Sequence, residues 1–318
     1  MDILKKVFIN FLRIGVSVAL LFFLFRQIDE KSIWGIVKNI NKPLLLLAFF
    51  IFFFNYVLCF YRWRMLLKGA GIHLSLKRII ISFSGGIFFN LFLPSTIGGD
   101  LIRSIDLGVH TKRPKEIFAT VILDRLSGYI GLVIVTLSAL LFGYRFIQSK
   151  SVATAVLIIA SILVGILLVF FNDFIYSRIN KLLHSPKAGK IREYITDVHK
   201  EIYVFRRHKI IILSNILLSI MVQAIMPVVF YIIALALGVN INIIYFFVYL
   251  PIIGAITLLP ISIGGLGLRD AITIFFFAQA GLSKDISFAM SLLNFSFLAV
   301  YAGIGGIIYV LTVRHRRI

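Results

Sequence analysis

Hydrophobic residues lie in long, nearly uninterrupted runs along this chain. Six runs are long enough to cross about 30 Å of hydrocarbon as helices, because an α-helix rises about 1.5 Å per residue. These predicted spans cover about residues 7–25, 43–60, 117–142, 152–171, 210–237 and 286–311. The pattern therefore predicts an all-α polytopic membrane protein with six full transmembrane helices. We expect a single membrane domain over residues 1–318.

Two further apolar runs, 79–93 and 244–259, are shorter. A helix of about 15 residues reaches only about 22 Å, which is too short to cross comfortably. Each run is followed by a proline, Pro94 or Pro260, then by a Gly-Gly pair and a second, moderately apolar segment. Proline and glycine interrupt helices. We therefore expect two re-entrant helical hairpins that fold back at these tips.

Positive charge indicates how these segments are oriented. Of the 33 Lys and Arg residues, 23 lie in segments that face the cytoplasm if the N-terminus does, and 7 lie in the outer segments. Cytoplasmic segments of membrane proteins carry the excess of Lys and Arg. Both termini and the basic loop 172–209 are thus expected in the cytoplasm, and 26–42 and 143–151 outside.

The two hairpins carry the same motif at an offset of 166 residues. Residues 93–103 align without gaps on 259–269, with Leu, Pro, a hydroxyl residue, Ile, Gly-Gly and Arg in matching places. Given the charge pattern, the two copies have opposite orientations. The sequence thus predicts an inverted repeat, with repeat 1 over about 1–145 and repeat 2 over about 150–318. Proteins of this kind bind substrate near the membrane midplane, between interrupted helices.

The hairpin tips contain residue types that suit an anion. Glycine permits a positive φ and leaves its backbone N–H accessible. A helix that begins at the tip would point its N-terminus into the protein, and such ends attract anions. Arg103 and Arg269 would complete a cradle for a phosphate. The alternative is that the glycine pairs only let helices pack closely. These glycines are Gly98, Gly99, Gly264 and Gly265.

Charged residues also lie inside a predicted span. Asp124 and Arg125 occupy 117–142, where a central charge costs about 2.5–3.5 kcal/mol on insertion scales, so such residues usually face a cavity or a partner. The functional interpretation is that arginine binds phosphate while aspartate orients arginine or carries a proton. The alternative is a structural ion-pair network. The predicted substrate-binding residues are Arg103, Arg125, Arg269, Asp100, Asp124, Asp270, Gly98, Gly99, Gly264 and Gly265.

Composition and motifs exclude several classes of function. The chain is 60% hydrophobic and only 14% charged, and its net charge is +20. Because the basic residues lie between apolar spans, the membrane surface is the expected partner and nucleic acid is not. The single cysteine, Cys59, and six scattered histidines show no metal-site spacing. Nucleotide-binding and nucleophile motifs are also absent from the sequence, so we expect no enzyme activity and no cofactor.

Several segments together resemble the lysylphosphatidylglycerol synthase/flippase membrane-domain family over essentially the whole chain. The resemblance implies a plasma-membrane protein that moves phospholipids, such as aminoacylated phosphatidylglycerol, between leaflets. Some members carry a soluble aminoacyltransferase domain that this sequence lacks, so synthase activity is not expected, and Asp270 stands where the family suggests Glu. The segments are Arg62-Trp63-Arg64, 89–94, Gly98-Gly99-Asp100, Arg103, Leu123-Asp124-Arg125 and 264–269.

The sequence therefore predicts a stand-alone, flippase-like transporter of an anionic or aminoacylated phospholipid, or of a lipid-linked phosphate. One alternative is an ion-coupled transporter of a small organic anion, which would need a sealed, water-facing pocket. Another is a membrane subunit that presents a lipid-linked substrate to a separately encoded transferase. A membrane phospholipid is the expected partner. A homodimer and a separate transferase are further partners that the sequence leaves open.

Overall fold

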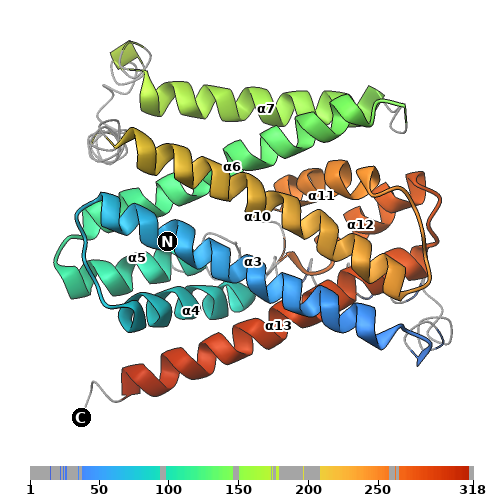
Figure 1. Ribbon diagram of the computed structural model, residues 1–318, viewed down its shortest axis with the longest axis horizontal. Helices are drawn as coiled ribbons and strands as arrows, with labels where there is room; N and C mark the ends of the chain where they lie inside the picture. Colours follow the sequence, from blue (N-terminus) through green and yellow to red (C-terminus); the bar gives the residue numbers. More distant parts are fainter. Residues whose placement is uncertain are drawn as a thin grey trace.

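The computed structural model describes residues 38–93, 98–145, 150–172, 208–257 and 265–314, together with single positions elsewhere. Within those residues the chain forms nine α-helices and no strand, which confirms the all-α prediction (Figure 1). The helices are α3 (Lys42–Gly69), α4 (Leu76–Phe92), α5 (Gly98–Thr111), α6 (Pro114–Phe142), α7 (Lys150–Phe171), α10 (Lys209–Ala236), α11 (Ile244–Thr257), α12 (Leu268–Gln279) and α13 (Lys284–Arg314).

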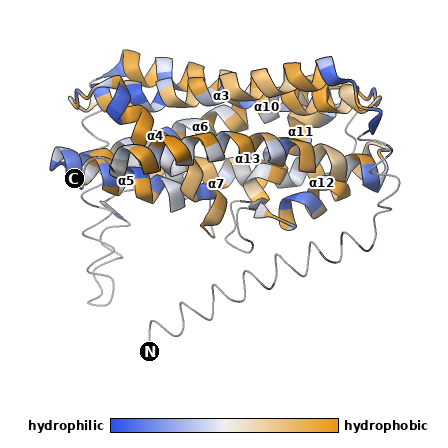
Figure 2. Cartoon of the chain, turned by 90° about the horizontal axis from the view of Figure 1, so that it is seen from below, coloured by the Kyte–Doolittle hydropathy of each residue, from blue (hydrophilic) through white to orange (hydrophobic). Residues whose placement is uncertain are grey.

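Four of the described helices, α3, α6, α10 and α13, are long and apolar enough to cross a membrane. They coincide with four of the six predicted spans, and the 22-residue α7 coincides with a fifth. The remaining predicted span, 7–25, lies outside the described residues except for single positions. Hydrophobic residues run along the outside of the long helices (Figure 2), where Phe50 and Leu141 are exposed. Such a surface suits lipid and not water.

The long helix α3 differs from its predicted span at one end. It begins where Asn41 caps it, with the Asn41 side chain accepting a hydrogen bond from the Leu44 N–H, and Pro43 lies in the first turn. This is a favourable start, because proline lacks an N–H that would go unpaired there. The helix ends at Gly69, and not at residue 60. Arg62, which follows the predicted span, is therefore helical and buried.

Each predicted hairpin contributes two described helices. The first limb α4 ends at Phe92 and packs against α5, which begins at Gly98. In the second hairpin α11 ends at Thr257 and packs against α12. The tips themselves, including Pro94, Pro260 and Gly264, lie outside the described residues. The depth of these tips in a membrane therefore stays a prediction.

The two hairpins differ in where their second helix begins. Gly98 starts α5, but at the corresponding place in the second repeat the helix begins four residues later, at Leu268. Gly265 and Gly267 both have a φ of +77°. This left-handed conformation is open to glycine at little cost and is incompatible with a continuing right-handed helix. The repeated motif thus forms two different local structures.

Two helices that the 166-residue offset relates, α3 and α10, are antiparallel neighbours (Figure 1). The backbone N–H of Asn41 donates to the Ala236 carbonyl at 2.9 Å, and the Asn215 side-chain amide donates to the Arg62 carbonyl at 3.0 Å. The start of each helix thus lies beside the end of the other. The first helix of each predicted hairpin packs against a helix of the other repeat. Thus α4 of repeat 1 packs on α13 of repeat 2, and α11 of repeat 2 packs on α6 of repeat 1.

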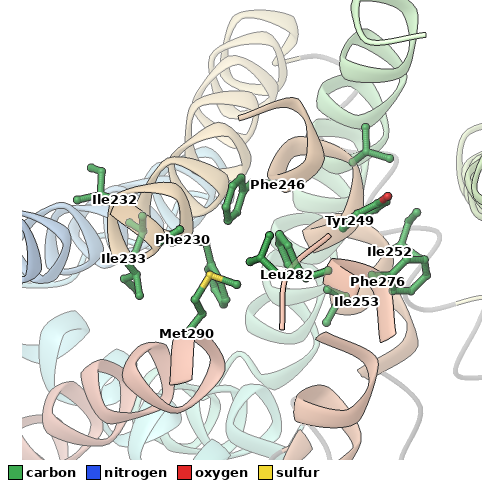
Figure 3. Close-up of a cluster of buried hydrophobic side chains, with 14 of the residues drawn as sticks. Phe230, Ile232, Ile233, Phe246, Tyr249, Ile252, Ile253, Phe276, Leu282 and Met290 are labelled. Carbon is green, nitrogen blue, oxygen red and sulfur yellow. The ribbon is translucent and has the colours of Figure 1, made fainter. Parts of the chain in front are cut away.

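A large apolar cluster fills the interior between α10, α11, α12 and α13 and the neighbouring parts of α3 and α7. Phe230, Phe246, Tyr249 and Met290 are among its members (Figure 3). The ring centroids of Phe246 and Phe277 lie 4.9 Å apart. Apolar side chains fill this region. The buried charged side chains of the first half instead surround a cavity, which is described next.

Candidate functional site

A buried aspartate on α6 lies at the centre of the site. Asp124 is only 3% exposed. Its Oδ1 accepts a hydrogen bond from Arg62 Nε on α3 at 2.7 Å, and its Oδ2 accepts one from Arg103 Nη2 on α5 at 3.0 Å. One carboxylate therefore binds two arginines from two other helices. A buried charge of this kind is tolerated when opposite charges and hydrogen bonds compensate it.

The ion pairs continue along α5. Asp100 and Arg103 are three residues apart and pair at 2.9 Å. The second carboxylate oxygen of Asp100 accepts a hydrogen bond from Arg125 Nε of α6. The result is an alternating series, Arg62–Asp124–Arg103–Asp100–Arg125, which we call the charge chain. It contains three positive and two negative side chains, so its formal charge is +1.

Neighbouring side chains orient the arginines of the charge chain. Arg62 Nη1 donates to Ser219 Oγ of α10 at 3.3 Å. The Arg103 guanidinium lies over the Trp63 ring, 4.5 Å from its centroid, in a cation–π contact. The Trp63 indole N–H in turn donates to Thr120 Oγ1 at 3.2 Å. These contacts fix two of the three arginines.

The charge chain lines a cavity of about 260 Å³ between α3, α4, α5 and α6. Arg125 is the most accessible of the three arginines, with 34% of its side chain exposed against 9% for Arg62 and 5% for Arg103. Within the described part of the chain, Arg103 Nε is buried without a hydrogen-bond partner. The cavity lining consists of Tyr56, Cys59, Arg62, Phe83, Gly86, Ile87, Asn90, Leu91, Asp100, Arg103, Asp124, Arg125 and Leu298.

The first glycine pair has a clear packing role. A Cβ atom added at Gly99 would lie 1.9 Å from the Gly86 carbonyl oxygen, and one added at Gly98 would lie 2.6 Å from Leu93 Cβ. The Gly99 N–H already donates to Asn90 Oδ1 at 2.7 Å. Close packing of α4 on α5 thus accounts for these glycines, as the alternative interpretation of the motif proposed. Gly265 instead serves the turn before α12.

Arg269 and Asp270 do not line this cavity. Arg269 pairs with Asp270 at 2.9 Å and donates to Ser291 Oγ at 3.1 Å. Asp270 also accepts a hydrogen bond from the Gly267 N–H, so it caps α12. The structure thus brings Asp100, Arg103, Asp124 and Arg125 together, as predicted, but places Arg62 beside them where we expected Arg269.

Arg62 was missed as a site residue because it follows the apolar run that predicted the span. The sequence did contain a signal, since the Arg62-Trp63-Arg64 segment contributed to the family resemblance. Continuing the helix by one turn beyond residue 60 would have put Arg62 at membrane depth, where a charged residue requires a partner.

Comparison with known proteins shows the family of this chain. A family model described as the lysylphosphatidylglycerol synthase TM region matches residues 10–305. The chain belongs to this family. Among its relatives is a UPF0104 membrane protein of Methanothermobacter thermautotrophicus, which is 23% identical over 84% of this chain and 84% of the relative. A UPF0104 membrane protein of Pyrococcus horikoshii is 24% identical over 88% of this chain and 90% of the relative.

Membership of the lysylphosphatidylglycerol synthase TM family, together with the four long apolar helices, identifies a multi-pass membrane protein with a lipid-related function. Both relatives are matched over most of their length. The matched region of the family includes every member of the charge chain, from Arg62 to Arg125.

Proposed function

We propose that this protein is a flippase-like transporter that moves an anionic or aminoacylated phospholipid, or a lipid-linked phosphate, between leaflets of the plasma membrane. The observation that carries this proposal is the charge chain with its net charge of +1 beside a cavity. An anionic group would compensate the excess positive charge. Transport of this kind requires no catalytic residue and no cofactor.

The geometry favours phosphate as the group that enters. The planar guanidinium of Arg125 is the most accessible cation of the charge chain, and guanidinium binds phosphate oxygens with two parallel hydrogen bonds. The buried, unpaired Arg103 Nε offers a further donor at the same cavity. Phosphate oxygens are strong acceptors and would satisfy Arg103 Nε.

The size of the cavity favours a lipid whose tails stay outside. Pockets that enclose drug-sized ligands measure about 300–1,000 Å³, and this cavity, at about 260 Å³, is smaller. It suits a head group, while the acyl chains remain against the apolar outer surface of the helices. The expected membrane arrangement is six spans and two re-entrant hairpins with both termini in the cytoplasm.

Leaflet transfer of a labelled anionic phospholipid in proteoliposomes tests the proposal. Arg125→Lys should slow transfer by about tenfold, because lysine keeps the charge but loses the two-pronged contact to phosphate. Arg113→Lys is the matched control, since Arg113 pairs with Glu116 and is 43% exposed. A transfer rate equal to that of the wild type in Arg125→Lys would show that this arginine only supports the fold.

Single-cysteine labelling tests the proposed orientation. In a Cys59→Ser background, a membrane-impermeant thiol reagent applied to intact cells should label Ser149→Cys but not Ser185→Cys. The reason is that 143–151 is expected outside, and the basic 172–209 loop is expected inside. Labelling of both after the membrane is permeabilised is the control for accessibility. External labelling at position 185 would overturn the proposed topology.

A further inference from the structure

The outward face of α5 is apolar. Leu101, Ile105 and Val109 are 50%, 53% and 76% exposed. They follow one another at intervals of four residues, so they lie on one side of the helix. The opposite side of α5 is buried and contains Asp100 and Arg103 of the charge chain. Helix α5 thus separates these buried charges from a surface that suits hydrocarbon and not water.

A positively charged turn follows the apolar face. Lys112 and Arg113 connect α5 to α6. The two Nη atoms of Arg113 donate to two backbone carbonyls of the loop that joins α3 to α4, at 3.3 Å each. The two segments that meet here, 68–78 and 106–116, contain six Lys and Arg and two Asp and Glu, a formal charge of +4. This excess of positive charge at the end of α5 matches an anionic partner.

Lys112 has an unusual backbone conformation. Its φ is +57°, and no other residue except glycine has a positive φ in the part of the chain that the structure describes. This left-handed conformation is unfavourable for a residue with a Cβ atom, and glycine is the common residue there. Lys112 is also exposed. A lysine where glycine would cost less indicates that its side chain has a role, either for the negative end of the helix dipole or for a ligand.

We propose that this surface binds an anionic phospholipid, whose phosphate lies on Lys112 and whose acyl chain lies along the apolar face of α5. The basic segments favour an anionic head group. The apolar face favours a lipid, because neither a soluble anion nor an acidic protein surface would use Leu101, Ile105 and Val109. Lys112 does not line the cavity of the charge chain, so the site is separate from that cavity and does not depend on transfer between leaflets.

Lipid retention by the purified, delipidated full chain tests the site. Native mass spectrometry would compare phosphatidylglycerol, which is anionic, with phosphatidylcholine, which is zwitterionic. One basic residue near an anionic membrane surface strengthens binding by about fivefold. Lys112→Gly should therefore lower the retention of phosphatidylglycerol by about fivefold and leave that of phosphatidylcholine unchanged. Unchanged retention of phosphatidylglycerol in this variant overturns the proposal.

The same variant separates lipid binding from a role in the fold. Glycine adopts the left-handed conformation without strain, so Lys112→Gly should unfold in lipid-free detergent at the temperature of the wild type or above it. Lower stability in detergent, together with equal losses of both lipids, would show that Lys112 only supports the end of the helix. Lys112→Arg keeps the charge and should retain phosphatidylglycerol as the wild type does.

Two further variants control for position. Lys42 is exposed in the first turn of α3, at the opposite end of that helix from the loop that Arg113 contacts. Lys42→Gln should therefore retain phosphatidylglycerol as the wild type does. The loss caused by Lys112→Gly should also persist in an Arg125→Lys background, because Arg125 lines the other cavity. If the loss disappears in that background, the charge chain holds the lipid and the separate site is wrong.

Inorganic phosphate distinguishes a lipid from a soluble anion. At a concentration equal to that of the lipid, phosphate should displace no phosphatidylglycerol, because it makes no contact with the apolar face. Displacement at that concentration overturns the assignment to a membrane lipid. Val109→Ser makes the most exposed position of the apolar face polar, and it should lower the retention of both lipids by the same factor. Unchanged retention of both lipids in Val109→Ser contradicts the contact with the acyl chain.

Discussion

Asp124→Ala is expected to lower the free energy of unfolding by about 3–5 kcal/mol, the range found when one partner of a buried ion pair is removed. The substitution leaves Arg62 and Arg103 buried without their shared carboxylate. It also raises the formal charge of the remaining charge chain from +1 to +2. Unfolding of the purified protein in mixed detergent micelles, followed by circular dichroism, would measure the change.

The matched control for Asp124 is the acid of an exposed ion pair. Glu116→Ala removes the partner of Arg113 on the same helix, α6, where the two side chains are 26% and 43% exposed. Exposed pairs contribute about 0–1 kcal/mol, so this variant should unfold nearly as the wild type does. If both variants lose the same small amount of stability, the charge chain contributes little to the fold.

Gly99→Ala is expected to destabilise the protein by about 3 kcal/mol, at the upper end of the usual cost of overpacking. The added Cβ would lie 1.9 Å from the Gly86 carbonyl oxygen and 2.6 Å from Asn90 Cγ. The first of these atoms is backbone, so α4 and α5 would have to separate. The hydrogen bond from the Gly99 N–H to Asn90 would then also be strained.

Gly303→Ala is the control for Gly99→Ala. Gly303 lies in the interior of α13, and a Cβ added there meets nothing within 4 Å. Alanine is the better helix former by about 0.8–1.0 kcal/mol, so this variant should match or exceed the stability of the wild type. Thermal unfolding of the two variants in the same detergent would compare them. Wild-type stability in Gly99→Ala would mean that the two helices do not pack as closely as described.

The helices could be predicted from the sequence because the constraint of crossing a membrane is simple. A long apolar run is sufficient to indicate α6, α10 and α13, and the Pro and Gly residues indicate where α4 and α11 end. The offset of 166 residues also relates α3 to α10, which the structure shows side by side in opposite directions. The positions of most described helices could therefore be predicted from the local sequence.

The site could be predicted only in part, for two physical reasons. A span predicted from hydropathy stops at the first charged residues. It therefore could not show that α3 continues through Arg62, or that Asp124 neutralises the charge of Arg62. The repeat suggested that Arg269 would act as Arg103 does. The two arginines have different partners in the structure. Arg269 pairs with Asp270, which also caps α12, whereas Arg103 pairs with aspartates on α5 and α6.

The sharing of Asp124 by two arginines also restricts how the sequence of this chain can change over time. An ordinary ion pair can be lost when both partners are replaced together. Here the carboxylate serves Arg62 on α3 and Arg103 on α5, so its loss leaves Arg62 without an acidic partner and Arg103 with Asp100 alone. Changes at these three positions are therefore strongly epistatic. Such a triad tends to persist as a unit even while the surrounding apolar sequence drifts freely.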